Sequence, residues 1–222
     1  MEKYFRKDEL LEDEKRASVP QLDYGDALGF IFLVCLLGTA LRIAKWFGWL
    51  PADILQHPST PFQISVTLAL LAGLYAIIRL RHTSSSVLIL LGWTIPAKSY
   101  FLAAIVGGAA LSLAVKHSAG LSIAPHVPSG SSILLAAIVA PILEESLLRG
   151  LLLPVLARSI HAVGAVSATA LLFAAIHGPP DLIHWFWLII CGVAYGAIRL
   201  RSESTTAAGM MHSIYNLVLL VL

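Results

Sequence analysis

Two adjacent carboxylates lie in the middle of a long apolar stretch, residues 133–156. In the interior of a membrane each carboxylate costs on the order of 3 kcal/mol on insertion scales, so a pair of them requires a reason. Glu145 and Arg149 stand at i and i+4 with the acid first, which is the favoured orientation for an ion pair on one helix face. Glu144 is rotated by about 100° from Glu145 and has no partner on its own helix. Pro141 disrupts the helix one turn before Glu144.

Two further polar groups interrupt apolar stretches nearer the C-terminus. His177 ends the run that begins at Phe173, and the Gly-Pro-Pro sequence that starts at Gly178 ends its helix. His212 and Asn216 stand at i and i+4, so they share one helix face and both can donate hydrogen bonds. Hydrolysis of an amide needs a base for water, donors for an oxyanion and a proton for the leaving amine. These side chains include candidates for all three tasks.

Transmembrane helices must position these residues. The 222 residues are 58% hydrophobic and 13% charged, whereas a soluble domain has about 25% charged residues, and the mean hydropathy is +0.82. Eleven of the charged side chains lie in the first sixteen residues. We therefore predict an all-α polytopic membrane protein, with a polar cytosolic tail at 1–24 and one transmembrane helical domain at 25–222. The net charge of +2 and the lack of a basic stripe argue against nucleic-acid binding.

Seven apolar stretches are long enough to cross a hydrocarbon core of roughly 30 Å. They are residues 26–47, 62–80, 100–116, 131–157, 160–178, 181–199 and 205–222. A shorter apolar stretch at 86–93 predicts an interfacial or re-entrant segment. Cytoplasmic loops carry an excess of Lys and Arg, and placing the N-terminus inside puts eleven of these residues inside and three outside. The sequence therefore predicts a cytoplasmic N-terminus and a C-terminus on the opposite side.

Small residues at four-residue spacing predict that the last four spans pack closely. Gly164 and Ala168 lie in the fifth span, and Gly192 and Gly196 lie in the sixth. With this orientation the site falls between the membrane centre and the outer leaflet. Tyr195 has an ordinary interpretation as a packing residue.

Other residue types in the chain predict no further site. Cys35 and Cys191 lie in apolar runs, so neither a disulfide framework nor a thiolate metal site is expected. Ser131 and Ser132, at a span boundary, are interpreted as helix-capping residues and not as the nucleophile of a serine protease. The remaining histidines are interpreted as interfacial; they are His57, His82, His117, His126, His161 and His184.

The three groups of residues resemble the ordered motifs of the CAAX protease and bacteriocin-processing family, also called the Abi family, of intramembrane endopeptidases. These motifs are Glu-Glu-x-x-x-Arg at 144–149, Phe-x-x-x-His at 173–177 and His-x-x-x-Asn at 212–216. The family includes the prenyl-protein endopeptidases that process CAAX proteins. The resemblance covers residues from about 130 to 222, whereas the first 125 residues show nothing specific to the family.

The resemblance implies a glutamate-dependent peptidase without a cofactor. In it, Glu144 and His177 activate a water molecule, and His212 and Asn216 stabilise the oxyanion. Glu145 and Arg149 shape the site. The implied partners are the lipid bilayer and a membrane-associated peptide or protein substrate. The implied location is the inner membrane of a bacterial or archaeal cell.

Three other functions remain open at this stage. The polar residues could instead join helices or conduct protons or ions, as intramembrane ionisable residues often do, although no duplicated halves typical of a transporter occur. The chain could serve as a membrane immunity or scaffold protein without proteolysis. It could also be a zinc peptidase with Glu144, His177 and His212 as ligands, although no His-Glu-x-x-His sequence is present.

Overall fold

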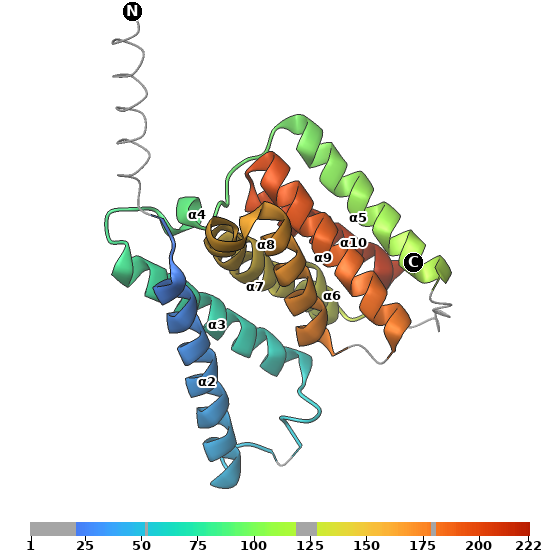
Figure 1. The fold of residues 1–222 in the computed structure, drawn as a ribbon. Helices are drawn as coiled ribbons and strands as arrows, with labels where there is room; N and C mark the ends of the chain where they lie inside the picture. Colours follow the sequence, from blue (N-terminus) through green and yellow to red (C-terminus); the bar gives the residue numbers. More distant parts are fainter. Residues whose placement is uncertain (1–20, 52, 119–127, 179–180) are drawn as a thin grey trace, which may run out of the picture.

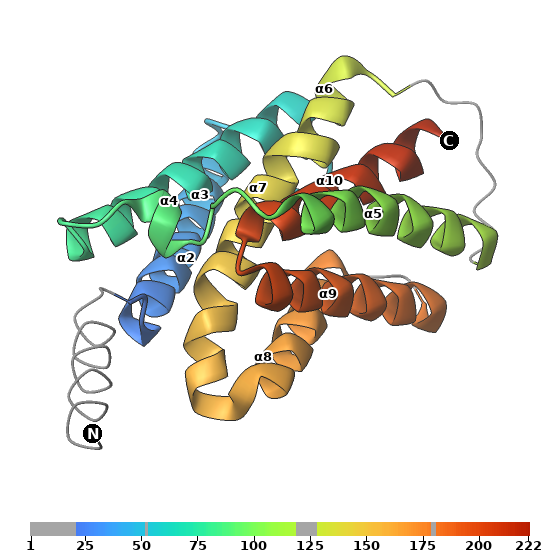
Figure 2. The same ribbon diagram turned by 90° about the horizontal axis from the view of Figure 1, so that it is seen from above.

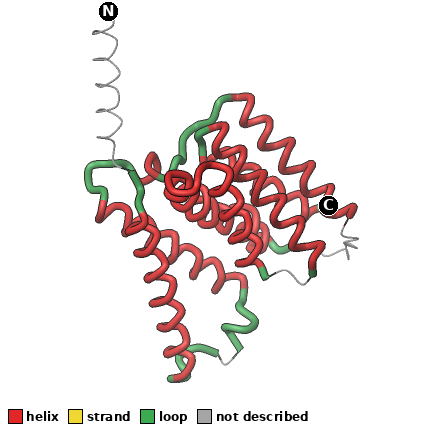
Figure 3. The backbone as a smooth tube through the Cα atoms, in the orientation of Figure 1, coloured by secondary structure: helices red, strands yellow, loops and turns green. Residues whose placement is uncertain are grey.

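The computed structural model describes residues 21–51, 53–118, 128–178 and 181–222, and in these residues every regular element is a helix (Figure 3). The predicted all-α class is therefore confirmed. Most of the predicted N-terminal tail, residues 1–20, lies outside the described residues, and its limit at residue 24 stays a prediction. The first described long helix, α2, begins at Tyr24.

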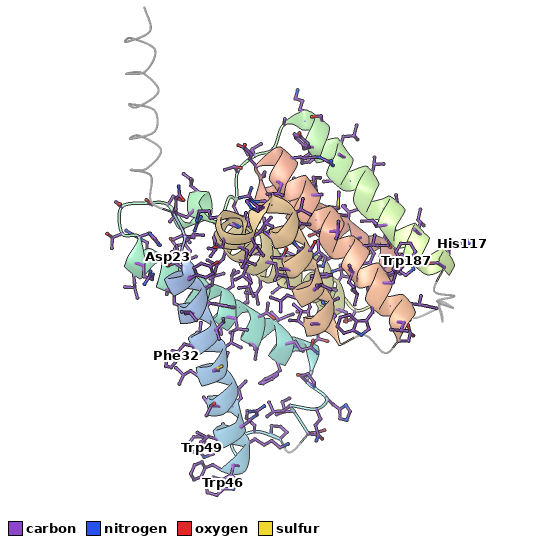
Figure 4. The ribbon with its side chains drawn as sticks, in the orientation of Figure 1. Asp23, Phe32, Trp46, Trp49, His117 and Trp187 are labelled. Atoms are coloured by element: carbon purple, nitrogen blue, oxygen red, sulfur yellow. The ribbon has the colours of Figure 1, made fainter. Side chains whose placement is uncertain are left out.

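Helices α2 (Tyr24–Trp46) and α3 (Thr60–Arg81) form an arm beside the remaining helices. They approach each other so closely at Gly73 that a Cβ atom there would collide with the Leu33 side chain. Figure 1 shows that α2 then runs away from the bundle. The large apolar side chains of Phe32, Trp46 and Trp49 point outward (Figure 4), where a bilayer would cover them.

A cluster of charged residues fixes the end of the arm at which α2 begins. The buried Asp26 carboxylate accepts hydrogen bonds from Arg81 Nε at 2.7 Å and lies 3.0 Å from His82 Nε2. Asp23 caps α2, and Arg81 Nη2 also donates to its Oδ1 atom at 2.9 Å. Burial raises the pKa of Asp23, but the backbone N–H groups that donate to it outweigh this effect and hold the pKa below its ordinary value.

The predicted short segment at 86–93 forms the single-turn helix α4 (Val87–Leu90) and the start of the connection to α5 (Lys98–Ser118). This connection lies against the beginning of α10 (Thr205–Val221), where Thr205 N–H donates to the Gly92 carbonyl at 2.7 Å. Trp93 Nε1 donates to Ser146 Oγ at 3.0 Å. The segment is therefore tied to the helix that carries the two carboxylates.

That helix is continuous from Gly130 but changes its winding along its length. It consists of α6, η1, α7, η2 and α8, with bounds Gly130–Leu134, Leu135–Val139, Ala140–Glu145, Ser146–Leu152 and Leu153–His177. Its N-cap is Ser129, whose hydroxyl oxygen accepts a hydrogen bond from the N–H of Ser132. The cap is therefore a serine just before Ser131 and Ser132, the two residues predicted for this role. Within α8 the backbone reverses direction at Ile160 and His161 (Figure 2), because His161 has φ +59° and ψ 166°.

This reversal divides Gly130–His177 into the two spans expected at 131–157 and 160–178. In the described ranges, five helices or continuous helical segments are long and apolar enough to cross a membrane; they are Tyr24–Trp46, Thr60–Arg81, Lys98–Ser118, Gly130–His177 and Leu182–Ser202. Counting the two halves of the fourth segment separately and adding the shorter α10 gives the seven predicted helices. The described part of the chain is thus a polytopic helical bundle.

The last helices form the core around the predicted site. Helix α9 (Leu182–Ser202) is capped by Asp181, and α10 packs against both α9 and α5 (Figure 1). The backbone N–H of His184 donates to Asp181 and lowers the pKa of this exposed carboxylate.

The small residues of α9 allow a close helix contact, as predicted. A Cβ atom on Gly192 would lie 2.8 Å from Ala170 Cα, and one on Gly196 would lie 3.1 Å from Val166. A contribution of Gly164 to this contact is not seen, because the three atoms nearest to a Cβ atom there all belong to Ile160 of its own helix. The buried face of α8 is instead shifted by one residue and includes Ala165.

Candidate active site

The two carboxylates lie on a short α-helical stretch between two π-helical ones. Stretch η1 precedes α7 and η2 follows it. At the ends of η1 and η2, the N–H groups of Ala140 and Leu153 bond to the carbonyls of Leu135 and Leu148, five residues back. Such π-helical stretches are rare and occur frequently at functional sites. They alter the angular positions of the side chains that follow.

The Glu145–Arg149 pair connects three helices at the centre of the site. Its Oε1 atom lies 3.2 Å from Arg149 Nη1 and 2.9 Å from His212 Nδ1, and the side chains of Glu145 and Arg149 are fully buried. The ion pair expected from the i, i+4 spacing is therefore present. Arg149 Nη2 also donates to the carbonyl of Gly192 on α9 at 2.8 Å. Glu145 thus joins its own helix to α10, and Arg149 joins it to α9.

Glu144 points toward two imidazoles from other helices. Its Oε2 atom lies 3.8 Å from His177 Nε2 and 4.0 Å from His212 Nε2. That oxygen has no hydrogen-bond partner among the described residues. The Glu144 side chain is 21% exposed and that of His177 is 33% exposed, whereas His212 is almost fully buried. The site is therefore open on the side of Glu144 and His177.

The partners of the two Nδ1 atoms determine where each imidazole carries its proton. His177 Nδ1 lies 2.7 Å from the Phe173 carbonyl oxygen, which can only accept, so this nitrogen carries hydrogen. His212 Nδ1 lies 2.9 Å from Glu145, whose charge Arg149 balances, and it therefore also donates. When the imidazoles are neutral, both Nε2 atoms present lone pairs to Glu144.

Asn216 lies one turn after His212 on α10. Its Nδ2 atom donates to the carbonyl oxygen of Ala136 at 2.7 Å. Ala136 belongs to η1, on the same continuous helix as Glu144. The structure thus brings five of the six predicted site residues into one network of contacts, and it ties the sixth, Asn216, to the backbone of the helix that carries Glu144.

Two aromatic side chains complete the site: Phe173, the first residue of the Phe-x-x-x-His motif, and Tyr195, which was interpreted from the sequence as a packing residue. Tyr195 stacks on His212 with ring centroids 4.8 Å apart and an interplanar angle of 16°. The ring of Phe173 lies 4.5 Å from that of His177 and 5.4 Å from that of His212. The Arg149 guanidinium lies over both aromatic rings, at 5.2 Å from Phe173 and 5.4 Å from Tyr195.

A signal for Tyr195 was present in the sequence. The residue stands between Gly192 and Gly196, the two positions that predicted a close helix contact. A tyrosine in such a contact lies in the bundle interior, so an interpretation as packing alone was incomplete.

The described residues hold no group of three or more His, Cys, Asp or Glu side chains arranged to bind a metal ion. Glu144, His177 and His212, the alternative zinc ligands, come together but do not form such a group. In this arrangement the Nε2 atoms can act as bases or, once protonated, as donors.

The fold and the site define a polytopic helical membrane protein with a buried acid–base cluster formed by three of its helices. Residues 126–218 match the family model described as type II CAAX prenyl endopeptidase Rce1-like. This match confirms the resemblance to the CAAX protease family, and the matched segment contains all six predicted site residues. The matched region is thus similar to the domain of a family of intramembrane endopeptidases. Comparisons with curated proteins and with solved structures give no match.

Proposed function

We propose that this protein is a glutamic-type intramembrane endopeptidase. It would hydrolyse a peptide bond in a membrane-associated substrate, such as a C-terminal tail or anchor. The observation that carries the proposal is the approach of one unpartnered Glu144 oxygen to the Nε2 atoms of His177 and His212, at 3.8 and 4.0 Å.

These distances suit an intervening water molecule. They are too long for direct hydrogen bonds, and the Glu144 oxygen and the lone pair on Nε2 of a neutral His177 provide two acceptors for one water molecule. A water molecule there can donate one hydrogen to Glu144 and the other to His177. Both interactions increase the electron density on the water oxygen and orient it for attack. Glu144 and His177 therefore act together to activate the nucleophile.

One proton moves from the water molecule to Glu144 and then to the leaving amine as the bonds change. The water oxygen forms a bond to the carbonyl carbon, Glu144 takes the water proton, and the carbonyl oxygen becomes an oxyanion. The oxyanion reforms the carbonyl as the C–N bond breaks, and Glu144 returns the proton to the leaving amine. The products are a carboxylate, whose proton passes to solvent, and an amine.

His212 and Asn216 would stabilise the oxyanion. His212 donates from Nε2 only when it is protonated, and the carboxylate of Glu145 at Nδ1 then stabilises the imidazolium and fixes its orientation. Asn216 has one amide hydrogen left after its bond to Ala136. Arg149 and Phe173 hold the supporting side chains, and the mechanism proposed here uses no metal or organic cofactor.

The membrane orientation predicted from the sequence suggests from which side of the membrane the substrate reaches the site. With a cytoplasmic N-terminus, the reversal at Ile160 and His161 lies inside and His177 lies near the outer end of its span. A substrate presented from the extracytoplasmic side, such as a secreted peptide or a sorting anchor, fits this arrangement better than a cytosolic tail does.

The test compares membrane proteomes from cells that express the wild type or Glu144→Gln. The amide preserves the shape of the side chain but does not accept a proton from water, so we expect new C-termini in substrates only with the wild type. Glu203→Gln makes the same chemical change at an exposed position after α9 and should behave as the wild type. Product formation by a folded, membrane-inserted Glu144→Gln protein at the wild-type rate would refute the role of Glu144.

A further inference from the structure

The bond between Asn216 and Ala136 depends on a free backbone carbonyl inside a helix. In an α-helix the Ala136 carbonyl would accept from the N–H of residue 140. Here the Ala140 N–H bonds instead to Leu135, five residues back. In this π-helical register the next donor, at position 141, would bond to Ala136.

Position 141 is a proline and has no N–H group. The two backbone groups that could donate to Ala136 are thus removed, one by the change of register and the other by Pro141. A buried or half-buried carbonyl without a donor is costly in an apolar environment. The Asn216 amide provides the missing donor at 2.7 Å.

We propose that Pro141 is a positioning residue for Asn216. This inference rests on the proposed function and deepens it. By leaving the Ala136 carbonyl free, Pro141 creates the anchor that holds the amide of Asn216 in one orientation. One amide hydrogen is used by the anchor, and the second is thereby fixed for the oxyanion. A freely rotating amide would lose conformational entropy during each catalytic cycle, whereas an anchored one is already oriented.

A second proline in the same helix provides a matched comparison. Pro154 comes soon after η2, as Pro141 comes soon after η1. The residue before it, Leu153, also bonds through its N–H five residues back, to Leu148. The carbonyl that Pro154 leaves without a backbone donor in this register is that of Arg149. Among the described residues no side chain donates a hydrogen bond to that carbonyl. Pro154 therefore frees a carbonyl in the same way, but no described side chain of the site is hydrogen-bonded to that carbonyl.

The experiment is a double-mutant cycle with Pro141→Ala and Asn216→Ala, and Pro154→Ala serves as the control. Pro141→Ala restores an N–H that competes with Asn216 for the Ala136 carbonyl. We expect kcat to fall roughly tenfold with KM changed by less than about twofold, since only transition-state binding is lost. In the Asn216→Ala background, Pro141→Ala should lower kcat no further. Pro154→Ala should leave kcat unchanged.

Thermal unfolding of the same variants tests the anchor independently of catalysis. Asn216→Ala should lower the Tm by several degrees when residue 141 is proline, because the Ala136 carbonyl loses the amide donor that it has in the described structure. It should lower the Tm less when residue 141 is alanine, because the new N–H replaces the amide. Equal losses of Tm in both backgrounds would overturn the anchor. If Pro141→Ala lowered kcat equally with asparagine and with alanine at position 216, Pro141 would act through Glu144 and not through Asn216. If the wild type cleaves no peptide, the proposed function fails, while the Tm cycle still decides whether the anchor exists.

Discussion

Replacing Glu145 by glutamine separates the structural and chemical roles of the residue. Glu145 Oε1 lies 3.2 Å from Arg149 Nη1 and 2.9 Å from His212 Nδ1, and neither Glu145 nor Arg149 is exposed. Glutamine has nearly the same shape but no charge. The substitution therefore leaves a buried guanidinium without its counterion and an imidazole without the carboxylate that fixes it.

Two different magnitudes follow from these contacts. Removal of one partner of a buried ion pair costs about 3–5 kcal/mol of folding stability. Loss of the carboxylate that orients a catalytic imidazole lowers kcat by up to about 10,000-fold in enzymes that use such a pair. For Glu145→Gln we expect a decrease in kcat of at least about 100-fold, together with a stability loss within that range.

The double substitution Glu145→Gln, Arg149→Met distinguishes the two effects. Replacement of a buried ion pair by uncharged side chains of similar volume is often neutral or stabilising, so the double variant should recover most of the lost stability. It should not recover turnover, because His212 still lacks its carboxylate.

The assays are unfolding in detergent micelles and single-turnover cleavage of a substrate identified by proteomics. The exposed change Glu203→Gln controls for the loss of a negative charge. If the double variant regained turnover together with stability, Glu145 would be only the counterion of Arg149, and the assignment of His212 to a fixed tautomer through Glu145 would be refuted.

Three other expectations concern the oxyanion site, metal dependence and orientation. Asn216→Ala should reduce kcat by roughly 100-fold with a smaller effect on KM, and a rise in KM at constant kcat would instead indicate substrate binding. Exhaustive chelation of a preparation shown by elemental analysis to be free of bound metal should leave cleavage unchanged; loss of activity with recovery on addition of zinc would contradict the metal-free mechanism. In a background without Cys35 and Cys191, Leu182→Cys should react with an impermeant thiol reagent in intact cells and Glu203→Cys should not, and the reverse result would invert the predicted orientation.

The helices could be predicted because apolar length and helix-ending residues are local properties. The Gly-Pro-Pro sequence after His177 predicted the end of α8, where Gly178 has φ +54°. The Glu145–Arg149 pair followed from i, i+4 spacing on one helix. The division of Gly130–His177 into two spans followed from the expected boundary near residues 158–159, although the structure forms a continuous helical segment with a two-residue reversal.

Tertiary contacts determine what could not be predicted. Spacing places His212 and Asn216 on one face, but it does not identify Glu145 and Ala136 as their partners. The α8 residues that meet Gly192 and Gly196 of α9 are Ala170 and Val166, and the spacing of Gly164 and Ala168 did not identify them. The Ala136 carbonyl is free because of the π-helical register and the missing N–H of Pro141, and its donor, Asn216, lies on another helix. Neither a helix propensity nor a hydropathy profile contains that contact.

The reversal at Ile160 and His161 has a consequence for how the protein enters the membrane. The two flanking helices have no loop between them to fold separately, so they should insert as one hairpin. The first helix brings two carboxylates with it, and Arg149 neutralises Glu145 within that helix before α10 and His212 have been synthesised. Only Glu144 then needs to be protonated or hydrated during insertion. The ion pair that supports the finished site therefore also lowers the energetic barrier to its biogenesis.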